Sequence, residues 1–222
     1  MHLPANFDSP PLNNILGDWL CALREFSVEA LVVLGPDAFA GEESRQLLAL
    51  HPPQQLEAAQ ALADSQDFGA PWRNSDAPLV AWQDISKSAY ETRSRWRRLW
   101  LAHGYQSMVR IAFPLVAGRA FECYLFSFRQ WPDHSEPAQL AWSALNIWPL
   151  LRRALAEARN PLSPRELECV DLAFQGATAR KSSEILLCSE RTVNFHLANA
   201  MGKLKVDNKM AAVQRACWLG LI

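Results

Sequence analysis

A proline directly after a long amphipathic segment divides this chain of 222 residues into two modules. Residues 136–159 carry apolar side chains at helical spacing, and Asn160 and Pro161 then end the segment, because proline disfavours a helical conformation at the residue before it. We therefore expect one domain over residues 1–159 and a smaller one over residues 160–222. Both lengths lie in the range of domains that fold independently.

The front domain alternates helical patterns with short β-rich runs. Apolar spacing predicts helices over residues 12–26, 42–50, 54–64, 86–103 and 136–159. Runs rich in β-branched and aromatic residues predict strands over residues 28–34, 105–116 and 121–128, the last two joined as a hairpin. Residues 65–78 have the glycine and proline content of a loop. Helices flanking a mainly antiparallel sheet predict an α+β fold, an α/β/α sandwich of the type found in small-molecule sensors.

The back domain opens with a strong helix-start signal. Ser163 is placed to cap a helix, Pro164 stands at its first position, and Glu166 completes a capping box. Gly176 ends this helix, because glycine readily adopts the left-handed conformation that closes many helices.

Three more helices follow, and a tight turn separates the second helix of the domain from the third. Thr178 and Ser189 are placed to cap these two helices, and a fourth covers residues 209–219. On the third helix, periodicity puts apolar side chains on one side and small or polar ones on the other. This order matches a helix-turn-helix, whose second helix enters the major groove of DNA. The predicted DNA-contacting residues are Ser189, Arg191, Thr192, Asn194, Phe195, Ala198, Asn199, Lys203, Lys205 and Lys209.

The distribution of charge supports an anionic partner for the back domain. Residues 1–159 hold 14 Lys and Arg against 17 Asp and Glu, whereas residues 160–222 hold 8 against 6. The distribution of lysine residues is more uneven still, since only Lys87 lies in the front domain. A basic module joined to an acidic one is typical of a protein whose basic part meets phosphates.

The back domain resembles the LuxR-type helix-turn-helix family. The resemblance covers residues 162–222 and rests on LSPRE at 162–166, SERTVNFHL at 189–197, KL at 203–204 and GLI at 220–222. It implies an all-α, four-helix domain that binds double-stranded DNA as a homodimer in the cytoplasm. Two departures bear on the strength of DNA binding: KSS at 181–183 stands where the family usually has Glu-Ile-Ala, and Asn194 stands where it usually has lysine.

The front domain resembles, more faintly, the autoinducer-binding domain of quorum-sensing LuxR regulators. The similarity rests on APLVAW at 77–82 and LFSF at 125–128, and it implies a ligand site containing Trp82, Ser127 and Asp67. Gln55, Ala59 and Met108 depart from the family's pocket residues. Three alternatives stay open: binding of an acyl-homoserine lactone, binding of another small molecule, or a core that holds no ligand. Trp82, with Trp96 and Trp100, is equally consistent with plain core packing.

The sequence motifs give little support to other classes of protein. No glycine-rich phosphate loop, nucleophile motif or paired-carboxylate motif is present, so we expect no enzyme, no catalytic residue and no cofactor. The histidines lack metal-ligand spacing, and the five scattered cysteines indicate free thiols in a reducing compartment. Neither a signal peptide nor a membrane segment is expected.

Two rival functions remain after these exclusions. A response regulator shares this helix-turn-helix, but it needs an acidic pair at the end of its first strand, which is absent before Gly35. The second rival is an antagonist that pairs with other LuxR-type regulators as a heterodimer and hardly binds DNA. The two departures in the back domain motivate it.

Overall fold

Five strands form an antiparallel sheet at the centre of the larger structural unit of this computed structural model. Their order across the sheet is β2-β1-β5-β4-β3, and every neighbouring pair is antiparallel. The strands are β1 Val28–Pro36, β2 Arg45–His51, β3 Leu79–Asp84, β4 Ser107–Pro114 and β5 Ala120–Ser127. The structure describes residues 9–37, 39, 44–65, 67, 78–87, 94–115 and 118–222.

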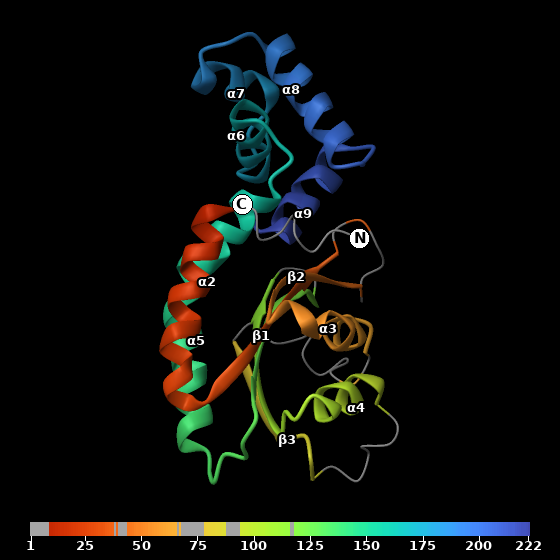
Figure 1. Ribbon diagram of the computed structural model, residues 1–222. Coiled ribbons are helices and arrows are strands. Elements are labelled where there is room, and N and C mark those ends of the chain that lie inside the picture. The colour runs from red at the N-terminus through yellow and green to blue at the C-terminus, as the bar shows by residue number, and fades with distance from the viewer. Residues whose placement is uncertain are drawn as a thin grey trace. The chain divides into compact units, whose positions relative to one another are not determined.

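Helices cover both faces of this sheet (Figure 1). One face carries α2 (Pro10–Leu23), which continues into the short 3-10 helix η1 (Arg24–Phe26), together with α5 (Ser135–Arg159). The other face carries α3 (Leu56–Ala63), which follows the 3-10 helix η2 (Pro53–Gln55), and α4 (Arg95–Ala102). The predicted α/β/α sandwich with an antiparallel sheet is therefore confirmed.

The alternation of side chains along the strands explains these two layers. On β1, Leu31 and Val33 point into the hydrophobic cluster that includes α2 and α5, whereas Val32 and Leu34 point into the cluster that includes α3 and α4. Because successive residues of a strand face opposite ways, a strand that is apolar throughout needs a cover on both faces.

The smaller unit, Arg159–Ile222, consists of four helices. These are α6 (Pro164–Phe174), α7 (Ala179–Leu186), α8 (Glu190–Lys203) and α9 (Lys209–Leu219). Their buried apolar residues include Val170, Val193, Ala200, Leu204 and Ala216. The predicted all-α, four-helix architecture is confirmed. None of the helices that the structure describes has the length and apolar character needed to cross a membrane.

One predicted helix of the front unit is a strand. Residues 42–50 were expected to be helical, but residues 45–50 belong to β2, and residues 41–43 lie outside the described part of the chain. A short apolar run fits a buried strand as well as a helix, so its periodicity does not decide between them. Pairing of β2 with β1, with Val32 opposite Leu50, selects the strand.

The predicted helix over residues 86–103 is shorter, and a strand that the sequence analysis missed precedes it. β3 ends at Asp84, whose carboxylate accepts hydrogen bonds from the Ser86 amide at 3.0 Å and the Ser86 hydroxyl at 2.6 Å. This side-chain turn competes with a helical start. Residues 88–93 lie outside the described chain, and α4 begins only at Arg95.

Candidate nucleic-acid interface

The predicted capping box begins α6. Ser163 Oγ accepts a hydrogen bond from the Glu166 amide at 3.4 Å, and Glu166 Oε2 accepts one from the Ser163 amide at 2.7 Å. Two backbone amides that a helix start leaves unpaired are thus satisfied. Glu166 is also nearly inaccessible to solvent, at 4% exposure, which is rare for a carboxylate and calls for a cationic partner.

Two further caps place α7 and α8 on either side of a tight turn. The Thr178 hydroxyl accepts from the Lys181 amide at 3.2 Å, and the Ser189 hydroxyl accepts from the Thr192 amide at 3.1 Å. Leu187 makes the turn with a φ of 53°, in the left-handed region. The helix-turn-helix order predicted from the sequence is therefore present, and local capping fixes the start of each helix.

The unusual serines of α7 lie inside the unit. Ser182 is 3% exposed and Ser183 is 9% exposed. The Ser183 hydroxyl donates a hydrogen bond to the Arg180 carbonyl at 2.7 Å, one turn back in the same helix. A buried hydroxyl that bonds to the helix backbone avoids most of the cost of desolvation, so the position accepts serine without losing the helix.

The α8 helix presents one buried face and one exposed face. Val193 and Ala200 are completely buried against the rest of the unit. The exposed residues of the helix include four of those predicted to contact DNA, Arg191, Asn194, Phe195 and Ala198. Thr192 and Asn199 are half-buried, and the Thr192 hydroxyl is hydrogen-bonded to the Ser189 hydroxyl at 2.8 Å. We refer to Arg191, Asn194, Phe195 and Ala198 together as the outer face of α8.

The three predicted lysines differ in their surroundings. Lys203, at the end of α8, places its Nζ 2.7 Å from Glu166 Oε2 at the start of α6. Lys205 follows α8 and Lys209 opens α9, and both are exposed. The lysine side chains therefore do not form one equivalent cluster, because Lys203 forms an ion pair with the nearly inaccessible carboxylate of Glu166.

The environment of Glu166 keeps it ionised. Burial alone raises the pKa of this carboxyl, but hydrogen bonds from Lys203 and from the amide and hydroxyl of Ser163 outweigh burial and lower the pKa below its ordinary value. The carboxylate thus joins the first turn of α6 to the last turn of α8. It holds the helix that carries the outer face.

Of the three ligand-site residues predicted in the front unit, Asp67 lies beside α4. Its Oδ2 accepts hydrogen bonds from Trp96 Nε1 and from the Ser94 hydroxyl, each at 2.7 Å. Trp96 is completely buried in the cluster on the α3–α4 face of the sheet. Asp67 therefore meets an indole that the sequence analysis treated as plain core.

The other two predicted ligand-site residues are not brought to Asp67. Trp82 packs against the cluster on the α2–α5 face, where its ring meets His134 edge-on at 4.6 Å. Ser127 ends β5 and is completely buried, and its Oγ accepts a hydrogen bond from the Arg129 amide at 3.2 Å.

A buried charged network, which the sequence analysis missed, lies on the α3–α4 face of the sheet. Arg110 Nε donates to Glu122 Oε2 at 2.9 Å and to the Tyr124 hydroxyl at 3.1 Å, and that hydroxyl donates to Glu122. Arg45 adds a second guanidinium 3.4 Å from the same carboxylate. Burial raises the pKa of Glu122, but Arg110 and Arg45 outweigh it and keep the pKa below its ordinary value. Two charges within otherwise apolar strands are the signal that could have revealed this network.

Arg45 also ties the network to α3. Its guanidinium donates to the carbonyls of Leu62 at 2.9 Å and Ala63 at 3.1 Å, and to that of Ser65. These carbonyls belong to the last turn of α3 and its continuation, where a helix leaves its acceptors unpaired. The network thereby fixes α3 on the sheet.

Aromatic side chains fill the sheet face beside α4. The rings of Trp100 and Phe126 stack at 3.7 Å with an angle of 7° between them, and Tyr105 meets Trp100 edge-on at 5.0 Å. Met108, one of the departures noted in the sequence, is completely buried in the same cluster. Burial raises the pKa of Tyr105 to about 12, so its hydroxyl stays neutral.

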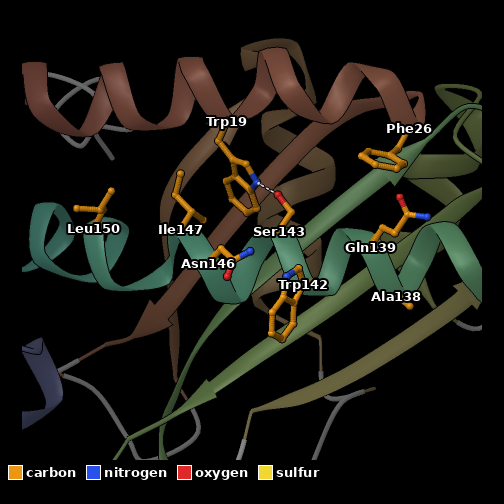
Figure 2. A pocket seen from close by; sticks show the side chains of 9 residues that line it. All are labelled: Trp19, Phe26, Ala138, Gln139, Trp142, Ser143, Asn146, Ile147 and Leu150. Carbon is orange, nitrogen blue, oxygen red and sulfur yellow. Dashed lines mark hydrogen bonds between the residues drawn. The ribbon is translucent and has the colours of Figure 1, made fainter.

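The opposite face of the front unit carries an apolar groove between α2 and α5 (Figure 2). Its volume is about 650 Å³, and Trp19 Nε1 donates to Ser143 Oγ at 2.9 Å across it. Trp142 and Leu150 line it and are 66% and 60% exposed. The lining residues are Trp19, Phe26, Ala138, Gln139, Trp142, Ser143, Asn146, Ile147 and Leu150.

No group of three or more His, Cys, Asp or Glu side chains that could hold a metal ion occurs among the described residues. All five cysteines lie among the described residues as free thiols, and Cys123, Cys169 and Cys217 are buried.

Comparison with known proteins agrees with this geometry. Residues 160–216 match the family model described as bacterial regulatory proteins, luxR family. The chain is 46% identical over 153 residues to the quorum sensing-dependent transcriptional regulator RpaR of Rhodopseudomonas palustris, an alignment that covers 67% of this chain and 59% of RpaR. It is 28% identical over 203 residues to the transcriptional activator SolR of Ralstonia nicotianae, covering 90% of this chain and 74% of SolR.

Among solved structures, the fold is similar to that of SdiA from Escherichia coli. The TM-score is 0.56 at 21% identity, and the match covers 95% of this chain and 92% of SdiA. A second SdiA structure, in complex with octanoyl-rac-glycerol, matches with a TM-score of 0.55 at 20% identity, over 93% of this chain and 88% of that one. At these identities the likeness establishes the shared fold of the front and back units.

Proposed function

The chain belongs to the LuxR family of quorum-sensing transcriptional regulators, and on this premise we propose that it acts in the cytoplasm as a homodimer bound to a two-fold-symmetric site on double-stranded DNA. Proteins of this family regulate transcription and are not enzymes. The observation that carries the proposal is the exposed outer face of α8, supported from behind by a buried side and held at its end by Glu166.

The chemistry of the outer face suits the major groove. Arg191 offers the planar pair of donors that matches the O6 and N7 acceptors of guanine, and Asn194 offers a donor and an acceptor, which together match adenine. Ala198 is small and allows the helix to approach the bases closely. Lys205 and Lys209 lie beyond the helix end, where cations contact phosphates and set the register on the duplex.

DNA binding is tested with the full-length chain and a random duplex library, followed by footprinting on the selected duplex. We expect two protected half-sites about one helical turn apart and an affinity that falls steeply with salt, since phosphate contacts release counterions. Arg191→Ala is expected to weaken specific binding more than non-specific binding. Arg165→Ala, an exposed arginine of α6 paired with Glu168, serves as the matched control. Selection that enriches no duplex would instead favour the antagonist that pairs with other LuxR-type regulators.

We propose the groove between α2 and α5 as part of the homodimer interface. Trp142 and Leu150 leave a large apolar area in water, and a two-fold axis lets the Trp142 ring of one copy enter the groove of the other. Sedimentation of the full chain at micromolar concentration is expected to give a dimer. Trp142→Glu is expected to give a monomer, while Leu56→Glu, an exposed apolar residue on α3, leaves the dimer intact. A monomeric parent chain would refute this interface.

For the front unit, we propose an altered sensor that stays folded without an acyl-homoserine lactone. Three features support this: the Asp67 carboxylate is engaged by Trp96, the charged network of Arg110 and Glu122 occupies the sheet face below α3, and Trp100 stacks on Phe126. Charges that pair and rings that stack within the protein contribute folding free energy without a ligand. By contrast, four side chains each keep a buried polar atom that lacks a hydrogen-bond partner among the described residues, namely Gln55, Trp82, Trp100 and Ser107.

A further inference from the structure

Phe195 is the most unusual member of the outer face of α8. An aromatic ring that is 61% exposed forgoes the burial that normally stabilises it, and its nearest ring contact is an edge-on approach to His196 at 5.8 Å. The residues on its two sides along this face differ in character: Arg191, one turn earlier, is charged, and Ala198, in the next turn, is small.

The space ahead of Phe195 along the helix is open. Gly202 lies on the same side as Ala198, and a β-carbon added at Gly202 would meet no atom within 4 Å. The ring therefore projects further from the helix axis than the small residues at positions 198 and 202. A flat partner that approaches the outer face of α8 meets the phenyl ring first.

We infer that Phe195 contacts the C5-methyl group of a thymine and thereby sets one base of the recognised sequence. The inference rests on the proposed DNA-binding function of α8. In the major groove, the thymine methyl is the apolar group that a base pair exposes, and apolar side chains such as phenylalanine contact it. Burial of the methyl against the ring removes both from water.

The helix geometry also places this thymine relative to the base contacted by Arg191. Four residues of α-helix advance about 6 Å, and base pairs rise about 3.4 Å, so the two contacts fall about two base pairs apart in each half-site. The expected half-site thus contains a guanine and, about two pairs away, a thymine whose methyl group matters.

The test uses the full-length chain and the duplex obtained by selection from the random library. Each thymine is replaced in turn by deoxyuridine, which removes only the methyl group, and affinity is measured by fluorescence anisotropy at fixed salt. We expect one position in each half-site where replacement weakens binding about fourfold, and about fifteenfold when both half-sites carry it. The Phe195→Ala chain is expected to bind the thymine and uracil duplexes equally, and more weakly than the parent chain binds thymine.

Two controls make the result specific to the phenyl ring. Phe195→Leu keeps an apolar side chain and is expected to retain part of the preference for thymine. Phe174→Ala removes a similarly exposed phenylalanine, 56% exposed, from α6 and is expected to retain all of it. Specific binding in which no methyl group matters, or a methyl preference that survives in Phe195→Ala, overturns the inference alone. Failure to select any duplex overturns both the inference and the proposed function.

Discussion

The ammonium group of Lys203 lies 2.7 Å from the buried carboxylate of Glu166, which joins the end of α8 to the beginning of α6. The two residues are 37 positions apart in the chain. Glu166 also closes the capping box of α6, so one carboxylate serves both the local start of a helix and the placement of the helix that carries the outer face. This relationship separates Lys203 from the other lysines expected to meet phosphates.

Lys203 and Lys209 are therefore expected to differ in their effect on the salt dependence of DNA binding. Lys209→Gln removes an exposed cation at the start of α9 and is expected to reduce the slope of log affinity against log salt by about 0.9 for each copy in the dimer. Lys203→Gln is expected to leave the slope unchanged and to lower the free energy of unfolding by about 1 kcal/mol, since its ion pair is partly exposed. Binding titrations at four salt concentrations measure the slope. An equal reduction of the salt-dependence slope in both variants would show that Lys203 contacts a phosphate.

The lowered pKa of Glu166 predicts an acid-sensitive contribution to stability. Because the folded state lowers this pKa below the ordinary 4.5, the contribution is complete above pH 4.5 and is lost as pH falls through the folded-state pKa. Urea unfolding of the parent chain and of Glu166→Gln, followed by circular dichroism, is expected to show a stability difference at pH 7 that shrinks below pH 4.5. In Lys203→Gln this loss is expected to be smaller and to end at a higher pH, because the folded-state pKa of Glu166 is lowered less. A difference that does not change with pH would contradict the assignment.

Leu187 predicts a stabilising substitution in the turn between α7 and α8. Its φ of 53° is unfavourable for a residue with a β-carbon, and its side chain is 92% exposed, so removal sacrifices no packing. Leu187→Gly is expected to raise the free energy of local unfolding around this turn by about 0.5–1 kcal/mol. This figure is the strain energy that glycine relieves minus the conformational entropy that glycine loses on folding. Hydrogen exchange of the α7 and α8 amides measures it. Leu187→Ala keeps the β-carbon and should change nothing; equal stabilisation by alanine would exclude strain as the cause.

The buried pair of Arg110 and Glu122 predicts strong coupling between two substitutions. Glu122→Gln leaves the Arg110 guanidinium, 2% exposed, without its carboxylate, and is expected to destabilise the front unit by about 3 kcal/mol. Arg110→Met combined with Glu122→Leu is expected to cost clearly less than Arg110→Met alone and Glu122→Leu alone added together. Urea unfolding followed by tryptophan fluorescence gives the three values. The exposed pair of Arg153 and Glu157 provides the control, at less than about 0.5 kcal/mol. Additive costs at the buried pair would show that the charges do not depend on each other.

The paired charges and stacked rings of the front unit predict a protein that is stable without added lactone. Thermal melting with acyl-homoserine lactones of several chain lengths, and with octanoyl-rac-glycerol, is expected to shift the melting temperature by less than a degree at low micromolar ligand. A ligand that binds only the folded state would raise it. A rise of several degrees, or a chain that is insoluble unless a lactone is present, would show that the ligand anchors come from residues other than Trp82, Ser127 and Asp67.

The sequence by itself determined the back unit nearly completely. Its helices begin at Ser163, Thr178 and Ser189, where side-chain caps act within three residues, and the two faces of α8 follow from helical periodicity. Those interactions are local, so a pattern of neighbouring residues is enough to predict them. The four-helix order and the exposure of Arg191, Phe195 and Ala198 on α8 agree with the prediction from the sequence, whereas Asn199, expected on the same side, is half-buried and Asn194, expected on a flank, is exposed.

Only the tertiary structure decided what depends on contacts between distant segments. The apolar run of β2 became a strand because β1 offers it a partner, and Glu122 received Arg110 because β4 and β5 pair in that register. The partner of Lys203 is likewise set by the packing of α8 on α6. Each of these outcomes depends on backbone pairing or burial between residues far apart in the chain. Local propensity carries no information about such pairing, because the same short run satisfies a helix or a strand until its neighbours are in place.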